Sequence, residues 1–510
     1  MHCDTGGRGW GFIIRKFLDY SDYEPPTPSP CVIFYGIIDA ILPTRRNKMR
    51  VLNEAKTKRH KLTSTQVIAL GFLAAIFLGC LLLLLPFASA RGQQTDFITA
   101  LFTATTSICV TGLVVVDTFS HWSFAGQFII LLLIQIGGFG VITLYSMIMM
   151  LMKKKFSLST RLLIQDYYNL DSISGLVRFL RRVIKDTLIV EGAGAVLYSI
   201  FFIPRFGFFK GLWISIFNAV SAFCNAGMDV IGPNSLIDYK TNVYLNIVTI
   251  TLIVLGGLGY VVWFDFIENF KRSIKHKYSP RSFWNRLGEH SKLVLFLTVF
   301  FLISGTLLVL LFEWNNPETI GYLTTGQKIL VSFFQSVTFR TAGFATVPQD
   351  ALTPSTCLVG CIYMFIGGSP VGTAGGIKTV TIFVVLLNVF SFIRNRTEPV
   401  VFSRSVSEKL IAKASAIVMS NLLLTVVLII ALIQVSHVPA LSAAYEIFSA
   451  TGTVGLSRGL TERLNLAGRI IVMIGMYAGR IGPISMALFF STRRSDKNDI
   501  KFSSGHYIVG

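Results

Sequence analysis

Eight long apolar stretches constrain this chain more than any other feature of its sequence. They lie near residues 66–88, 125–152, 183–203, 241–264, 291–312, 357–392, 414–436 and 469–491. Each is long enough to cross a hydrocarbon layer of roughly 30 Å as a helix, and none alternates polar and apolar residues as barrel strands do. With 52% hydrophobic and 14% charged residues, the chain is expected to be an all-α integral membrane protein with eight transmembrane helices.

The net charge of +20 is unevenly distributed along the chain. Of the 46 Lys and Arg residues, 32 fall in five segments, at 43–62, 153–185, 271–292, 394–413 and 493–501. These segments alternate with segments that hold few basic residues, which is the bias typical of cytoplasmic loops. We therefore expect both termini in the cytoplasm, contact of the basic loops with anionic membrane lipid, and no nucleic-acid partner.

The cysteines and the N-terminal region exclude several classes of protein. The seven cysteines form no CxxC pair, so neither a disulfide framework nor a metal site is expected. The first 60 residues lack the order of a cleaved signal peptide. The stretch 31–43 is too short to span, and is expected either to lie at the interface or to be untranslated, with Met49 as a plausible start. Residues 1–63 are thus expected to form a basic cytoplasmic extension.

Four short glycine motifs indicate an internal repeat. They are FTATTSICVTGLVVVDT, FNAVSAFCNAGMDVIGP, FFQSVTFRTAGFATVPQ and EIFSATGTVGLSRGLTE, centred on Gly112, Gly227, Gly343 and Gly455, which lie 115, 116 and 112 residues apart. Each motif ends a short apolar segment of about a dozen residues, too short to cross a bilayer. A second glycine signal follows each motif: GGFG, GGLG, GGSP and AGRIG.

This recurrence predicts four tandem membrane–pore–membrane repeats, with four re-entrant pore helices around a pseudo-fourfold axis. The repeats are expected at 64–152, 183–270, 291–393 and 411–492, followed by a cytoplasmic tail at 493–510. Irregular backbone at membrane depth is tolerated where it faces water or protein, which suits segments that dip in and return.

Glycine reaches backbone conformations that are closed to other residues, so four glycines in register can turn carbonyl oxygens toward a common axis. A ring of carbonyls replaces the hydration shell of a monovalent cation, and the C-terminal ends of the short helices add partial negative charge. Glycines that merely allow close helix packing would not explain four in register. The expected ion-binding residues of this filter are Val110, Thr111, Gly112, Asn225, Ala226, Gly227, Thr341, Ala342, Gly343, Thr453, Val454 and Gly455.

The sixth apolar stretch is expected to break. A single helix from Leu358 to Phe392 would be roughly 50 Å long, and GGSPVGTAGGIKT lies in its middle at 367–379. We expect a mobile loop that obstructs the pore below the filter, with an ordinary kink at Pro370 as the alternative. A phosphate-binding loop is excluded because Ile377, not glycine, precedes the lysine. The expected gate residues are Gly367, Gly368, Ser369, Pro370, Gly372, Thr373, Gly375, Gly376, Lys378 and Arg480.

Two arginines lie at membrane depth. Arg480 is roughly 16 Å from the outer end of its helix, and we expect a fixed positive barrier that a permeating cation must pass. The alternative is a pairing of Arg480 with an acidic residue or with loop carbonyls. Arg340, three residues before Gly343, is expected to brace the filter backbone with its donors.

Other polar residues near the motifs have more than one interpretation. Asp117 and Asp229 should lie near the outer mouth, where they either concentrate cations or are ordinary solvated carboxylates. Cys109 and Cys224 precede filter residues and are expected to be small packing groups.

Together these motifs resemble the Trk/Ktr/HKT superfamily of potassium transporters, and most closely the ion-translocating membrane subunit of Ktr systems. The resemblance covers roughly 64–510, and residues 1 to about 48 lie outside its pattern. It is carried by STQVIALGF, CVTGLVVVDT, FCNAGMD, TFRTAGF, GGSPVGTAGGIKT, GTVGLSRGLT and GRIGPIS. In that family, glycine in all four filter motifs goes with potassium selectivity and serine in the first motif goes with sodium, so Gly112 favours potassium.

The resemblance also implies partners. It predicts a homodimer and a cytosolic ring of nucleotide-binding regulatory subunits similar to KtrA. No cofactor is expected in this chain: potassium is the transported ion, sodium is a possible activator, and nucleotide acts through the regulatory partner.

The expected function is potassium uptake across the plasma membrane of a prokaryotic cell through a gated pore. The rivals are a sodium- or proton-coupled potassium symporter and a sodium-permeable cation transporter. Coupled carriers usually show inverted repeats and intramembrane acids, whereas these four repeats share one orientation and the spans hold almost no carboxylates. An enzyme is not expected, because the seven histidines are scattered and none pairs with an acidic or metal-ligand motif.

Overall fold

A computed structural model describes residues 64–140, ten positions between 141 and 174, and residues 175–396 and 398–482. The expectations for residues 1–63, including the stretch 31–43 and Met49, lie outside the described residues. So do those for the C-terminal tail at 493–510.

Each of the four repeats consists of a long first helix, a short pore helix and a second helix. The first helices are α3 (Ser64–Leu83), α9 (Leu176–Phe206), α14 (Glu289–Glu313) and α18 (Glu408–Ser436). The pore helices are α4 (Phe97–Cys109), α10 (Phe208–Cys224), α15 (Thr325–Thr338) and α19 (Ala440–Gly452). The second helices are α6 (Phe124–Phe139), α11 (Val243–Leu258), α16 (Pro354–Phe365) and α20 (Leu466–Ile481).

The first helices carry the apolar surface that a bilayer requires. By length and composition, these four helices can each cross a membrane unaided. Large apolar side chains such as Leu78, Leu311 and Leu423 are 60–70% exposed on them. Contact with lipid explains such exposure, because a water-facing surface would not hold so many large apolar groups.

All four second helices start in the same way. The side chain of the residue before the helix accepts a hydrogen bond from the backbone N–H three residues later, which satisfies one otherwise free donor of the first turn. The capping residues are Ser123, Asn242, Thr353 and Asn465.

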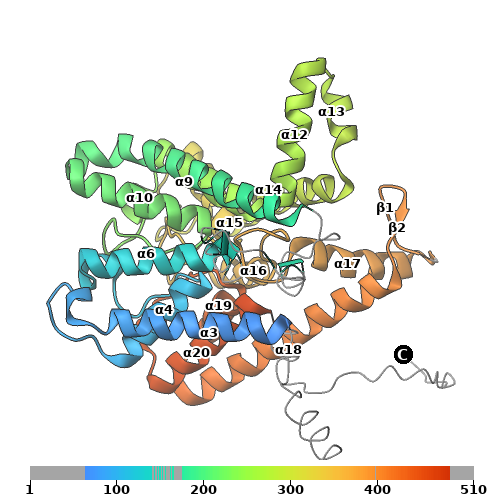
Figure 1. Cartoon of the computed structure of the whole chain (residues 1–510). Helices are drawn as coiled ribbons and strands as arrows, with labels where there is room; N and C mark the ends of the chain where they lie inside the picture. The colour runs from blue at the N-terminus through green and yellow to red at the C-terminus, as the bar shows by residue number, and fades with distance from the viewer. Residues whose placement is uncertain are drawn as a thin grey trace, which may run out of the picture. The chain divides into compact units, whose positions relative to one another are not determined.

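The packing of the helices closes a ring. Within the repeats, α4 packs against α3 and α6, α10 against α9 and α11, and α19 against α18 and α20 (Figure 1). Between repeats, each second helix packs against the pore helix of the next repeat: α6 against α10, α11 against α15, and α16 against α19. Finally α20 returns to α4, so the fourth repeat adjoins the first and the pore helices surround one axis.

The second spans differ from the expected uninterrupted helices. α6, α11 and α20 are followed directly by Gly140, Gly259 and Gly482, all with positive φ. α11 continues into α12 (Tyr260–His276) only after a 102° bend. The stretch 241–264, expected to cross as a helix, is therefore broken within its length. The reason is the second glycine signal, which supplies a residue able to adopt that conformation at each break.

The predicted break in the sixth stretch is present. α16 ends at Phe365 and α17 (Thr379–Ile393) begins fourteen residues later, and the thirteen residues between them are not helical. The remaining elements are short: η1 (Pro86–Ala88), α5 (Thr118–His121), η2 (Ile237–Tyr239), α13 (Pro280–Arg286), η3 (Thr461–Arg463), and an antiparallel hairpin of β1 (Val400–Val401) and β2 (Arg404–Ser405).

Candidate functional site

A left-handed residue follows each of the four pore helices, directly after α4, α10 and α19 and three residues after the end of α15. The residue two positions before each motif glycine has a positive φ, between 51° and 65°, and the glycine itself has a φ between 67° and 97°. The first group is Val110, Asn225, Thr341 and Thr453, and the second is Gly112, Gly227, Gly343 and Gly455. A left-handed residue stops a helix and turns the chain, so each motif leaves its helix in a short extended segment.

The four motif glycines form a closed ring. A Cβ atom added at Gly112 would lie 2.5 Å from the carbonyl oxygen of Ala226, the residue before the second motif glycine. A Cβ at Gly227 would lie 2.7 Å from the Ala342 oxygen.

The other two glycines continue and close this order. A Cβ at Gly343 would lie 2.5 Å from the Val454 oxygen, and one at Gly455 would overlap the Thr111 oxygen. Each repeat thus approaches the backbone of the next, leaving no room for a side chain. The structure therefore brings together all twelve expected filter residues.

Hydroxyl groups in the pore helices hold the filter backbone. The Gly112 N–H donates to Thr106 Oγ1 at 3.0 Å, and the Gly455 N–H donates to Ser449 Oγ at 3.0 Å. In the middle repeats the hydroxyl donates instead to a carbonyl beyond the glycine: Ser221 to Met228 at 2.5 Å and Thr338 to Phe344 at 2.7 Å. These hydroxyl residues were not predicted, although a hydroxyl five or six positions before each glycine is a visible signal in the sequence.

The side chains just before the glycines contain polar atoms without partners. Asn225 Nδ2 donates to Thr341 Oγ1 at 3.4 Å, while Thr111 Oγ1, Asn225 Oδ1 and Thr453 Oγ1 are buried without a hydrogen bond among the described residues. Asn225 Oδ1 lies against Gly256 of α11 and Thr453 Oγ1 against Gly375, so these two oxygens face the elements that surround the filter.

The second glycine signal brings the second helices against the pore helices. In three repeats, a Cβ on one of its glycines would overlap the carbonyl oxygen four residues before the motif glycine. The pairs are Gly137 with Ile108, Gly256 with Phe223, and Gly479 with Thr451. These glycines therefore allow close packing directly behind the filter.

The loop between α16 and α17 packs beneath this ring. The Ser369 and Thr373 N–H groups donate to the carbonyls of Gly257 and Gly256 in α11, at 3.0 and 3.1 Å. The Thr373 hydroxyl donates to the Phe223 carbonyl at the end of pore helix α10, at 3.0 Å. A Cβ at Gly375 would overlap the Thr453 hydroxyl, so the loop contacts the second and the fourth filter segments.

The two cations of the expected gate bind loop carbonyls. Arg480, on α20, donates to the Thr373 carbonyl at 2.6 Å and to the Gly137 carbonyl of α6. Lys378 Nζ donates to the Ala374 carbonyl at 2.6 Å. Arg480 forms no ion pair among the described residues, so of the two pairings considered the structure has the one with carbonyls. Nine of the ten expected gate residues thus lie in the loop 367–379, and the tenth, Arg480, is hydrogen-bonded to that loop.

A buried carboxyl that the sequence analysis did not single out lies behind the second filter segment. Glu191, on α9, is 5% exposed and accepts hydrogen bonds from Gln135 Nε2 at 3.1 and 3.2 Å. Cys224, which ends pore helix α10, donates to the same carboxyl with its thiol at 3.6 Å. Cys224 is therefore more than a small packing group, whereas Cys109 is fully buried in the core.

The acidic residues after the first two motifs have different surroundings. Asp117 accepts hydrogen bonds from the Phe119 and Ser120 N–H groups and so caps α5. Asp229 is half-buried; burial raises its pKa to about 6, with a further upward contribution from the charge of Asp117. The two carboxyl groups therefore interact electrostatically, beyond the glycine ring.

Comparison with known proteins identifies the family. Residues 32–500 match the TrkH family, described as cation transport protein. The chain belongs to this family. It is 38% identical over 449 residues to the potassium/sodium uptake protein NtpJ of Enterococcus hirae, covering 87% of this chain and 96% of that protein. It is 35% identical over 450 residues to the Ktr system potassium uptake protein B of Bacillus subtilis, covering 88% and 97%.

The fold of this TrkH-family chain also matches a solved structure. The potassium transporter TrkH from Vibrio parahaemolyticus superposes with a TM-score of 0.67 at 17% identity, covering 85% of this chain and 86% of that one. The resemblance inferred from the motifs is thus confirmed. Its expected start was too late, because the family match includes residues 32–48.

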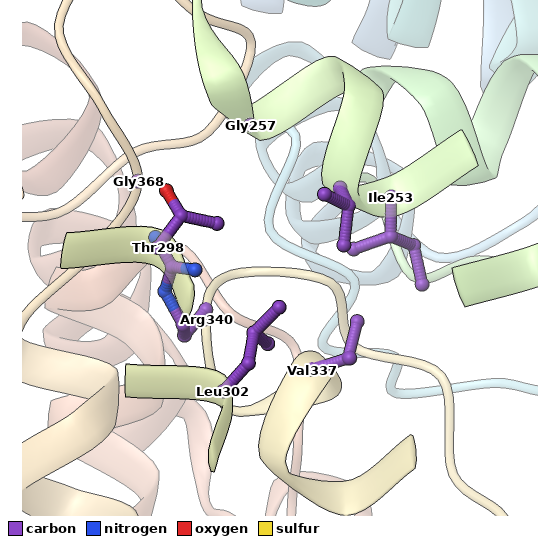
Figure 2. A pocket seen from close by; sticks show the side chains of 8 residues that line it. Ile253, Gly257, Thr298, Leu302, Val337, Arg340 and Gly368 are labelled. Atoms are coloured by element: carbon purple, nitrogen blue, oxygen red, sulfur yellow. The ribbon is translucent and has the colours of Figure 1, made fainter. Parts of the chain in front are cut away.

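One residue of this TrkH-family chain departs from its expected role. Arg340 was expected to brace the filter backbone, but its guanidinium makes no hydrogen bond within the described part of the chain, and its Nε is buried without a partner. The side chain instead enters a small cavity between α11 and α14 (Figure 2). The expectation was wrong because the chain turns after α15, which directs this side chain away from the ring.

Proposed function

We propose that this chain takes up potassium across the plasma membrane of a prokaryotic cell through a pore whose filter is the ring of carbonyls before Gly112, Gly227, Gly343 and Gly455. The observation that carries the proposal is the cyclic contact of each glycine with the carbonyl oxygen of the next repeat. Main-chain oxygens held in a ring can substitute for the water around an alkali ion. The names of the relatives, which specify potassium or potassium/sodium uptake, support the same ion.

The proposal includes a gate. The segment 367–379 lies against the lower side of the filter and is held by Arg480 and Lys378, and we assign it the role of an obstructing loop. Backbone hydrogen bonds to α11 hold it in the closed position, and these bonds can exchange with water when the loop moves.

The proposal extends to partners. The names of the Ktr relatives describe a system, which supports further components beside this chain. We assign these, from the resemblance of the motifs, as a second copy of the chain and a cytosolic ring of nucleotide-binding subunits. Sodium would act as an activator, and nucleotide would act through that ring. The basic segments support cytoplasmic termini and contact with anionic lipid.

One flux experiment tests the filter and the coupling together. The full-length protein and its Gly112→Ser variant are placed in proteoliposomes, and rubidium uptake is measured with and without a sodium gradient at a fixed potential. We expect uptake to persist without the gradient, and Gly112→Ser to lose preference for potassium over sodium because its Cβ would meet the Ala226 oxygen at 2.5 Å.

Gly92→Ser is the matched control, since Gly92 also has a positive φ but has no atom within 4 Å of an added Cβ. An unchanged potassium preference in Gly112→Ser would contradict the backbone filter. Uptake that requires the sodium gradient would instead favour the coupled symporter, for which the intramembrane carboxyl of Glu191 is a candidate.

A further inference from the structure

Arg340 carries a positive charge that the described protein leaves uncompensated. It lies two residues beyond the end of α15 and three before Gly343, and is 8% exposed. Its guanidinium has no hydrogen-bond or ion-pair partner among the described residues. The C-terminal end of α15 supplies only about half a negative charge.

The acidic residues on the elements around Arg340 are engaged elsewhere. On α14, Glu289 forms an ion pair with Arg404 at 2.6 Å. At the opposite end of α14, Glu313 accepts hydrogen bonds from Thr319 and Thr353 at 2.7 and 2.8 Å. α11 contains no acidic residue. Burying an arginine at this depth without a counter-charge costs free energy, so we expect a negatively charged partner from outside the described residues.

A cavity beside Arg340 can hold such a partner. It is lined by residues from α11, α14, the end of α15 and the gate loop, and both Thr298 and Arg340 belong to this lining (Figure 2). Thr298 is 6% exposed, and its Oγ1 is also buried without a hydrogen bond among the described residues. The cavity has a volume of about 10 Å³, which is room for about one small guest.

We propose that this cavity binds one small monoatomic anion, which is chloride in the cell. The guanidinium and the Thr298 hydroxyl both donate to it, and both orphaned groups are thereby satisfied. A water molecule would satisfy the hydrogen bonds of Arg340 and Thr298 but would leave the positive charge of the guanidinium without compensation. The rest of the lining, including Ile253, Leu302 and Val337, is apolar and suits a polarizable halide, while phosphate, sulfate and carboxylates exceed the space.

The bound anion would influence cation transport. Arg340 lies three residues before Gly343 of the third filter segment, and Gly368 of the gate loop lines the same cavity. An unneutralised guanidinium repels a cation in the filter, and the interior screens that repulsion poorly. We therefore expect faster cation flux when the anion is bound, an effect that rests on the proposed filter function.

Binding is tested independently of transport. Crystals of the full-length protein are soaked in bromide, and the anomalous signal is measured for the parent, Arg340→Gln and Thr298→Val. We expect a bromide peak between Arg340 and Thr298 in the parent, no peak in Arg340→Gln and a weaker peak in Thr298→Val. Thr306→Val is the matched control, because Thr306 lies on the same helix and its hydroxyl is satisfied by the Leu302 carbonyl at 2.6 Å.

Transport is then measured as rubidium uptake at a fixed potential, with chloride replaced on both sides by gluconate, which is too large for the cavity. We expect a several-fold loss of uptake in the parent, recovery with bromide, and no anion dependence in a folded Arg340→Gln variant. Thr298→Val should need more bromide for the same recovery.

Each outcome bears on a separate claim. An empty cavity, or one holding only water in bromide-soaked crystals, would overturn the anion site even in an active transporter. A bromide peak with anion-independent uptake would overturn the effect on the filter. A parent that takes up no rubidium in any anion would refute the proposed function and leave the anion peak standing.

Discussion

Gly455 lies directly against the carbonyl oxygen of Thr111, so that the filter segment of the last repeat meets that of the first across more than 340 residues of chain. A Cβ at Gly455 would overlap this oxygen, and the glycine also has a φ of 96°. Two independent restrictions, backbone conformation and lack of space, therefore act at one position.

Gly455→Ala should abolish selective uptake. The added methyl group must displace the Thr111 carbonyl, which is proposed to face the ion. Gly459→Ala is the control: Gly459 has a φ of 71° but no atom near an added Cβ, so it should cost only about 1 kcal/mol of conformational energy. The measurements are rubidium uptake, the potassium-to-sodium ratio and thermal unfolding. Equal selectivity in the two variants would show that the close approach is unimportant.

Arg480→Met should increase uptake. The substitution keeps an apolar chain in place but removes both the positive barrier and the hydrogen bonds to the Thr373 and Gly137 carbonyls. We expect an increase on the order of tenfold, equivalent to about 1.4 kcal/mol off the barrier. Arg469→Met on the same helix is the control, because Arg469 donates only to Leu464 and Glu462 in the segment before α20. A decrease in uptake by folded Arg480→Met would argue against a barrier.

Uptake should fall as the external pH is lowered from 7.5 to 5.5. Burial raises the pKa of Asp229 to about 6, so the group is charged above that pH and neutral below it. At pH 5.5 about three-quarters of the molecules would carry a neutral Asp229, and the attraction of cations to the mouth would weaken. Asp229→Asn should show low uptake throughout this range. If the variant keeps the parent's pH profile, another group is responsible.

Glu191→Ala should destabilise the protein by about 1–3 kcal/mol, because it leaves the part-buried amide of Gln135 and the buried thiol of Cys224 without an acceptor. Glu191→Gln keeps the size and one acceptor oxygen, so it should unfold near the parent temperature. Thermal unfolding in detergent measures both. A large loss in Glu191→Gln would instead indicate that the carboxylate charge matters to the fold.

Much of the architecture was visible in the sequence because membrane helices are encoded locally. A run of apolar residues must satisfy its own backbone as a helix, and a dozen such residues cannot cross, so spans and pore helices follow from length alone. The glycines recur because the same backbone turn occurs in each repeat. The break at 367–379 was predictable for the same reason: its glycines lie in a stretch too long for one helix.

The positions of the polar side chains were not predictable from sequence. Arg340 was expected at the filter, but the turn after α15 directs it into a cavity formed by α11 and α14. Glu191 was not singled out in the sequence, because its partners come from α6 and from the end of α10. Such contacts join residues distant in sequence, and no periodicity encodes them.

The sequence by itself thus determined the membrane class, the four repeats, the turn glycines and the family, because each depends on the length and conformational freedom of a single segment. The tertiary structure decided the cyclic order of the repeats, the pairing of Arg480 with carbonyls and the burial of Arg340. Those features depend on which segments meet when the ring closes, and only the packing of each second helix against the next pore helix specifies that closure.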